Sequence, residues 1–284
     1  MTEASFQYMS DLHLEMRPGL RINPNDVRAP YLILAGDIGD PGTHEYVNFL
    51  THAAKLYESV FVVLGNHECY GRRMDKAKRL ADVACSRAGT GNDDNHVDNV
   101  FLLNRNRPFA IAKCKNGNDF IRVLGCTLWS HVPSEAAPEV RSGLSDYRAI
   151  QGFGIQTGNN EHESDATWLK NQLLEARSCN VKCIVVTHHA PLMNGTSHPM
   201  YESDPDRSLR HAFATDMSSL LKEFADVAPV WIHGHTHHTH KSVLKCDDGS
   251  CVTVASNQRG YNAKEGIDFR TDVDPITVSN VAQK

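Results

Sequence analysis

Short, uninterrupted apolar runs recur along the chain, and a cluster of polar residues follows each of them. The runs cover residues 6–9, 31–35, 60–64, 122–126, 181–187 and 230–233. Their Val and Ile content and their lack of alternation are typical of strands that are covered on both faces. Helical patterns lie between them, at residues 43–57, 73–87, 164–178 and 207–225. Strands that alternate with helices predict a layered α/β fold.

Two further patterns indicate that the sheet structure is mixed rather than purely parallel. Residues 241–244 and 251–255 are joined by Asp-Asp-Gly-Ser, which predicts an antiparallel hairpin. Short apolar runs at residues 100–103 and 109–112 precede the run at 122–126 with only short connections. Ser164 is expected to cap the third helix, and the polar residues 152–163 and 194–206 are expected to form loops. No repeat or linker is visible, so residues 1–284 are predicted to form a single domain.

The composition narrows the class of protein without identifying it. The chain has 284 residues, 40% of them hydrophobic, and a formal net charge of -5. No run approaches the roughly 20 apolar residues that cross a bilayer, and no signal peptide is visible, so a cytoplasmic protein without a membrane partner is predicted. The mildly acidic charge argues against nucleic acid as a partner. Eight cysteines are expected to be free thiols, with a Cys246–Cys251 disulfide as the alternative in an oxidising compartment.

The polar clusters at the strand ends carry candidate metal ligands. Strand ends converge on one edge of an α/β sheet, where ligands bind. The candidates, in chain order, are Asp11, His13, Asp37, Asp40, Asn66, His67, His188, His189, His235 and His237. A set of Asp, His and Asn without cysteine argues against a structural zinc site. It is too large for one ion, whereas two ions bridged by a carboxylate would use it and could hydrolyse a phosphate ester. As single residues, Asp40 and His189 could instead be a turn former and a satisfied polar residue.

Five short segments together resemble a known family. They are Asp11-Leu12-His13, Gly36-Asp37-Ile38-Gly39-Asp40, Gly65-Asn66-His67-Glu68, Thr187-His188 and Gly234-His235-Thr236-His237. In this order, and each at a predicted strand end, they look like the five motifs of the calcineurin-like metallophosphoesterase superfamily. The resemblance implies a four-layer α-β-β-α sandwich, with two mixed sheets and a dinuclear metal site at the strand ends.

The resemblance also implies a role for each motif residue. Asp11, His13 and His237 would hold one divalent ion, and Asn66, His188 and His235 the other, with Asp37 bridging the two. His189 is the alternative to His188. Mn, Fe, Zn or similar metals suit these ligands. A metal-bound hydroxide would attack phosphorus without a phosphoenzyme, and His67 would be the catalytic residue beside the phosphate, as general acid or charge stabiliser. Glu68 and Asp40 would orient the ligands.

The substrate is defined less sharply. Asp146-Tyr147-Arg148 and Asn257-Gln258-Arg259-Gly260-Tyr261 resemble segments of one bacterial and fungal branch of the superfamily. Arg148 and Arg259 could clamp phosphate oxygens or anchor loops, and Tyr70 could contact substrate or only cover the site. A small phosphodiester or phosphomonoester is expected. The alternative is a catalytically silent scaffold for protein binding, which predicts missing ligands, whereas every position is filled. No oligomeric state is indicated.

Overall fold

Strands β1, β2, β3 and β4 run parallel in the first of two mixed sheets. The computed structural model describes residues 3–89, 98–107, 109–115, 119–203 and 208–279. Within them this sheet has the order β11-β1-β2-β3-β4, and β11 is antiparallel to β1. The bounds are Glu3–Met9 for β1, Tyr31–Ala35 for β2, Ser59–Val63 for β3, Val100–Leu102 for β4 and Ile276–Ser279 for β11.

The second sheet is also mixed, with the order β5-β6-β7-β8-β10-β9. Its four middle strands are parallel, and β5 and β9 are antiparallel at the two edges. The bounds are Ala110–Lys113 for β5, Phe120–Cys126 for β6, Cys183–Thr187 for β7, Val230–Ile232 for β8, His240–Lys245 for β9 and Cys251–Ser256 for β10. The predicted hairpin is therefore present as β9 and β10.

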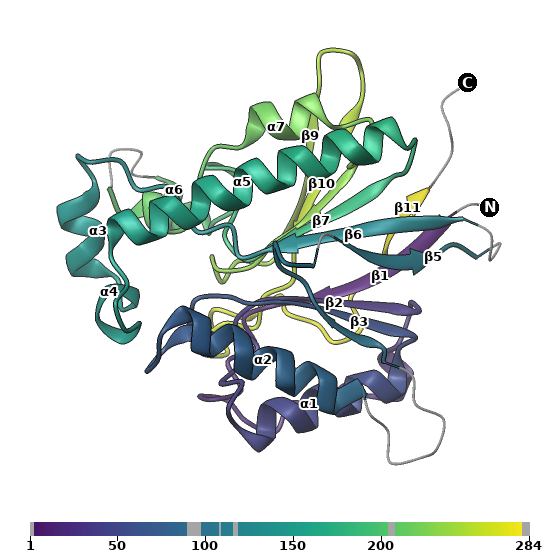
Figure 1. The fold of residues 1–284 in the computed structure, drawn as a ribbon, viewed down its shortest axis with the longest axis horizontal. Coiled ribbons are helices and arrows are strands. Elements are labelled where there is room, and N and C mark those ends of the chain that lie inside the picture. The colour runs from purple at the N-terminus through teal and green to yellow at the C-terminus, as the bar shows by residue number, and fades with distance from the viewer. Residues whose placement is uncertain (1–2, 90–97, 108, 116–118, 204–207, 280–284) are drawn as a thin grey trace.

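The two sheets pack face to face, and helices cover both outer faces. Phe6, Ile33 and Phe61 of the first sheet join Val123 and Val186 of the second in one buried core. A second core lies between the first sheet and its helices, and a third lies between the second sheet and α5 and α7. The helices are α1 (His44–Leu56), α2 (Met74–Gly89), α5 (Ile155–Ser178) and α7 (Ser218–Glu223). Figure 1 shows the resulting α-β-β-α order, which confirms the predicted layers.

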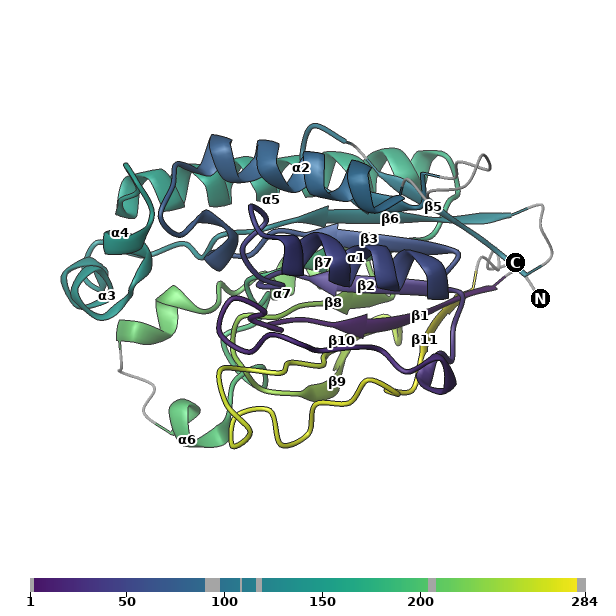
Figure 2. The same ribbon diagram turned by 90° about the horizontal axis from the view of Figure 1, so that it is seen from below.

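Shorter elements gather at one end of the sandwich. The parallel strands of both sheets end on this side, and α3, α4 and α6 lie beyond it (Figure 2). The short helices are α3 (Ala137–Gly143), α4 (Asp146–Ala149) and α6 (Pro199–Glu202), with 3-10 turns at His67–Cys69 and Ser208–Ala212. The 3-10 turn at Pro24–Asp26 lies elsewhere, and the carbonyl of Asp26 accepts from Gln7 of β1. This arrangement leaves one edge where the strand-end side chains can meet.

Two predicted helix boundaries are wrong. Helix α5 begins at Ile155 and Ser164 lies inside it, where its hydroxyl donates to the carbonyl of Asn160 instead of capping the helix. Residues 155–163 thus belong to a long helix, in which Gly158 and His162 are buried, and do not form a loop. The predicted helix at 207–225 is broken: Ala214 pairs with Ala190 in a β-bridge, and Asp216 accepts from the backbone N–H of Ser218 where α7 begins. Its first residue lies outside the described part of the chain.

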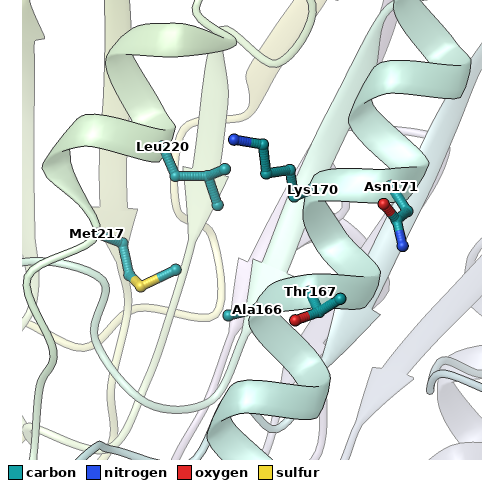
Figure 3. A pocket seen from close by; sticks show the side chains of 6 residues that line it. All are labelled: Ala166, Thr167, Lys170, Asn171, Met217 and Leu220. Carbon is teal, nitrogen blue, oxygen red and sulfur yellow. The ribbon is translucent and has the colours of Figure 1, made fainter.

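Other features agree with the sequence or rule out competing sites. All eight cysteines are free thiols. No helix among the described residues has the length and apolar character that a membrane crossing requires. A hollow of about 310 Å³ lies between α5 and α7, lined by Ala166, Thr167, Lys170, Asn171, Met217 and Leu220 (Figure 3). Since this lining offers no carboxylate, imidazole or thiolate, the hollow is not a rival metal site.

Candidate metal centre

Five of the seven predicted metal ligands have a left-handed backbone. Their φ angles are positive, at 52° for Asp11, 47° for His13, 52° for Asp37, 71° for His235 and 49° for His237. Non-glycine residues adopt this conformation rarely and at a cost, and such residues cluster at functional sites. The turns are held by backbone hydrogen bonds, from Asp11 to Gly36 and from His13 to Asp37, both 3.0 Å long. The strained backbone at these five residues is therefore offset by the rest of the fold, and it directs their side chains to one edge.

The first ligand group consists of Asp11, His13 and His237, whose ligand atoms lie within 4.8 Å of one another. The Nε2 atoms of His13 and His237 are 3.0 Å apart, and Asp11 Oδ1 is 3.5 Å from His237 Nε2. Their Nδ1 atoms face carboxylates, that of His13 at 3.2 Å from Glu15 and that of His237 at 2.7 Å from Glu265. In the neutral imidazoles the Nδ1 atoms therefore carry the protons, and two Nε2 lone pairs face each other. A cation between them fits this arrangement.

The second group shows the same convergence of acceptors. Asp37, His188 and His235 bring their ligand atoms within 4.8 Å of one another. His188 Nδ1 lies 2.9 Å from the carbonyl of Ala35, so in the neutral ring the Nε2 lone pair faces Asn66 Oδ1 at 3.0 Å and Asp37 Oδ2 at 3.4 Å. Asp37 Oδ2 is also 3.9 Å from His13 Nε2 in the first group. The carboxylate of Asp37 thus lies between the two groups, which is the position of a bridging ligand.

The orientation of Asn66 is set by a buried carboxylate. Its Nδ2 atom donates to Asp146 Oδ1 at 2.8 Å, which leaves Oδ1 to face His188. The same Asp146 oxygen accepts from the hydroxyl of Tyr70 at 2.7 Å. Burial raises the pKa of Asp146, although Tyr70 and Asn66 oppose this change. Asp146 therefore supports the candidate metal ligand Asn66 from behind.

The electrostatics of the two groups favour a cation. Burial raises the pKa of Asp37, but His188 and His67 more than reverse this and hold it well below its usual value. Burial lowers the pKa of His188, and Asp37 overrides it and raises that pKa to about 10. Burial and the nearby His188 lower the pKa of His235, which keeps it neutral. The negative field that draws a proton to His188 would equally attract a divalent ion.

The choice between His188 and His189 is clear in the geometry. His188 belongs to the second ligand group. His189 directs Nδ1 at the hydroxyl of Ser130, 2.8 Å away, and packs its ring against His235 with centroids 4.0 Å apart. The structure therefore brings His188 among the candidate ligands and leaves His189 behind one of them, His235.

His67 lies beside both groups. Its backbone N–H donates to Asp37 Oδ1 at 2.9 Å, Nδ1 is 3.1 Å from Glu15 Oε1, and Nε2 is 2.8 Å from the hydroxyl of Tyr261. Burial lowers its pKa, but the charge of Asp37 and the hydrogen bond to Glu15 raise it to about 9. The raised pKa favours the cationic ring, which has a proton on each nitrogen. His13, Glu15 and His67 also form a third set of possible ligands within 4.8 Å.

The two residues expected to orient ligands do different things. The buried carboxylate of Glu68 accepts backbone N–H bonds from Asp37, Ile38 and Gly65, and so joins the second motif to the third. Asp40 instead forms a bidentate pair with Arg72 at 2.7 and 2.8 Å, at the start of α1. Support of the ligand loops thus comes through Glu68.

The three substrate-contact candidates occupy distinct positions. Tyr70 stacks on His67, with centroids 4.1 Å apart and the rings inclined by 28°. Arg148 is exposed and donates to the carbonyl of Ser142 at 2.8 Å. Arg259 donates to the carbonyls of Leu12 and Arg17 at 2.9 and 2.7 Å. Arg148 therefore joins α4 to α3, and Arg259 holds the loop that carries Leu12 and Arg17. Tyr70 is the one of the three that touches the catalytic histidine candidate.

Four residues of this site were missed in the sequence: Glu15, Asp146, Tyr261 and Glu265. Each contacts a motif residue: Glu15 from two positions after His13, Asp146 from α4, and Tyr261 and Glu265 from the loop between β10 and β11. The sequence could have pointed to Glu15, because it lies two residues after His13. Asp146 and Tyr261 lie in the two segments that resemble one branch of the superfamily, Asp146-Tyr147-Arg148 and residues 257–261. No sequence pattern pointed to Glu265.

Two motif glycines are required by close approach to ligands. A Cβ on Gly36, whose φ is +90°, would lie 2.3 Å from His188 Nδ1. A Cβ on Gly65 would lie 2.1 Å from Asp37 Oδ1. Any side chain at either position would displace a metal-ligand candidate.

Comparisons with known proteins agree with this geometry. Over 97% of its length the chain is 28% identical to an uncharacterized protein of Acanthamoeba polyphaga mimivirus, and covers 99% of that protein. The phosphopantetheinyl hydrolase of Mycobacterium tuberculosis shares its fold with a TM-score of 0.61 and 17% identity, over 94% of this chain and 93% of the other. A putative 5'-nucleotidase from Staphylococcus aureus gives a TM-score of 0.51 and 14% identity, over 91% of this chain and 49% of the other. The model of the calcineurin-like phosphoesterase family matches residues 9–239. The chain belongs to the calcineurin-like phosphoesterase family.

Proposed function

We propose that this protein hydrolyses a phosphate ester, a small phosphodiester or phosphomonoester, with two divalent cations as cofactors. The observation that carries the proposal is the carboxylate of Asp37, which lies 3.4 Å from His188 in one ligand group and 3.9 Å from His13 in the other. Mn, Fe, Zn or similar ions match a donor set of carboxylate, amide and imidazole groups. When bound, such a pair supplies an activated water and neutralises charge on the phosphate.

The ligand assignment follows the two groups. Asp37 reaches both, and its backbone and carboxylate are held by Glu68 and by the N–H of His67. The remaining ligands are Asp11, His13 and His237 for the first ion and Asn66, His188 and His235 for the second. Each imidazole in these groups has its other ring nitrogen near a carboxylate or a carbonyl, which fixes the tautomer that a metal requires.

His67 is proposed as the catalytic residue that protonates the leaving oxygen. Glu15 and Asp37 keep it cationic, so Nε2 has a proton to give. Its Nδ1–H remains bonded to Glu15 while Nε2 acts, because the ionised carboxylate can only accept. Tyr70 stacks on the ring and limits its rotation. The cytoplasmic location remains a prediction from the sequence.

The test is hydrolysis of p-nitrophenyl phosphate and bis-p-nitrophenyl phosphate by metal-stripped protein that has been resupplied with Mn²⁺. Turnover that requires Mn²⁺ and that Asp37→Asn abolishes supports the proposal, and the ratio of the two rates separates monoesterase from diesterase activity. Asp75→Asn is the matched control, because that carboxylate pairs with Arg79 on the surface. Bound Mn²⁺ without turnover of either ester contradicts the proposal and favours a silent scaffold.

A further inference from the structure

Tyr261 covers the first ligand group from the loop between β10 and β11. Its ring centroid lies 4.5 Å from that of His13, 4.3 Å from that of His237 and 5.5 Å from that of His67. The side chain is also 39% exposed, so the ring closes the site on one side and meets solvent on the other. Three histidines of the site therefore share one aromatic neighbour that none of the five motifs includes.

The hydroxyl of Tyr261 lies at the nitrogen through which His67 must act. His67 Nδ1 faces the carboxylate of Glu15 at 3.1 Å, and an ionised carboxylate only accepts hydrogen bonds. Nε2 is thus the ring nitrogen available to a substrate, and the Tyr261 hydroxyl is 2.8 Å from it. A leaving oxygen that approaches Nε2 closely enough to take a proton also comes within hydrogen-bond reach of this hydroxyl.

The position of Tyr261 is fixed by residues that also support the ligands. Its backbone N–H donates at 2.9 Å to Glu265 Oε2, the same oxygen that lies 2.7 Å from His237 Nδ1. Arg17 donates to the carbonyl of Gly260 at 3.0 Å and so joins this loop to the one that carries His13. Tyr261 is therefore held relative to the ligand groups and is not a freely moving surface side chain.

We propose that Tyr261 is a second catalytic side chain, whose hydroxyl donates a hydrogen bond to the leaving oxygen beside His67. The proposal rests on the proposed phosphoesterase function. As the water oxygen bonds to phosphorus, the bond from phosphorus to the leaving oxygen breaks, and the protons of the water leave with the phosphate product. The proton on His67 Nε2 passes to that oxygen, and His67 is left neutral. Tyr261 keeps its own proton and stabilises the charge that develops on the leaving oxygen before it is protonated.

The test compares Tyr261→Phe with wild type on phenyl phosphate and p-nitrophenyl phosphate, both with Mn²⁺. Phenylalanine retains the ring that covers the site and removes only the hydroxyl. Phenolate is the more basic leaving group, so it gains more from a hydrogen bond in the transition state. We expect a loss of at least about ten-fold on phenyl phosphate, which is the lower limit for one hydrogen bond to a charged group, and a loss below about three-fold on p-nitrophenyl phosphate.

The matched control is Tyr147→Phe, a tyrosine of α4 that stacks on Phe153 and packs in an apolar cluster that contains no ligand candidate. It should leave both rates unchanged. An equal loss on both esters, no loss on either, or reduced Mn²⁺ content in Tyr261→Phe would overturn the proposal.

A second measurement, NMR of the metal-free protein, needs no turnover. Tyr261→Phe should shift the ring nitrogen resonances of His67, and Tyr147→Phe should not. Unchanged His67 resonances in Tyr261→Phe would overturn the contact. If wild type hydrolyses no ester although Mn²⁺ is bound, the proposed function itself fails.

Discussion

Glu68 offers the sharpest test of how the ligand loops are held. Its side chain is fully buried, and its carboxylate accepts backbone N–H bonds from Gly65 at 2.8 Å, Ile38 at 2.8 Å and Asp37 at 3.2 Å. Glu68→Ala leaves these three donors without their acceptor. A buried donor without an acceptor lowers the free energy of unfolding by about 1–3 kcal/mol, so the three together lower it by at least about 3 kcal/mol. This is a large part of the about 5–15 kcal/mol by which domains are stable.

Glu68→Gln should be milder, because an amide keeps one accepting oxygen. If that oxygen faces Gly65 and Asp37, the amide nitrogen meets the N–H of Ile38 and one bond is lost, at about 1–3 kcal/mol. Burial and the charge of Asp37 raise the pKa of Glu68 to about 8, while His188 and the N–H donors of Ile38 and Gly65 oppose this change. The expected order of destabilisation is therefore alanine greater than glutamine.

The assay is urea unfolding of the metal-free protein, so that lost metal affinity does not contribute to the change. The matched control is Glu45→Ala, which removes a partly exposed carboxylate that accepts one N–H bond from Gly19 at 2.7 Å. We expect this control to change the free energy of unfolding by less than about 1 kcal/mol. A Glu68→Ala variant no less stable than the Glu45→Ala control would refute the reasoning.

Two further predictions concern the same edge. Gly65→Ala should weaken Mn²⁺ binding about ten-fold in calorimetry, because its Cβ would displace Asp37 Oδ1. The control Gly154→Ala, whose Cβ meets nothing within 4 Å, should leave the affinity unchanged. Equal Mn²⁺ affinities of the two variants would contradict this prediction. In metal-free protein the pKa of His67 is about 9, above its unfolded value, so the stability it contributes is complete below about pH 6.5 and is lost as the pH rises through 9. Glu15→Gln should lower that pKa in an NMR titration, and an unchanged pKa would exclude Glu15 as a cause.

The elements that position the site could be predicted because each is a buried strand with a polar end. The run at residues 31–35 coincides with β2, and the other parallel strands near the site differ from their runs by a few residues at most. A strand that is covered on both faces has no polar face to obscure it, so the apolar run and the strand are nearly the same segment. The motif residues then follow at the strand ends.

The rest depends on contacts that a sequence does not display. The start of helix α5 could not be predicted, because its buried positions there are Gly158, His162 and Asp165. These residues give no apolar stripe in the sequence. Tyr261 and His67 are 194 positions apart and meet only because two loops reach the same edge. Likewise, the positive charge of Arg259 suits a phosphate contact, but its side chain donates to the carbonyls of Leu12 and Arg17. These bonds result from the packing of the loops, which the sequence does not show.

The most direct measurement of the central claim is anomalous X-ray diffraction from crystals that contain Mn²⁺. Two manganese peaks are expected in each chain, one among Asp11, His13 and His237 and one among Asn66, His188 and His235, with Asp37 in contact with both. A single peak, or a peak among His13, Glu15 and His67, would contradict the dinuclear assignment, because that third set of side chains converges equally closely.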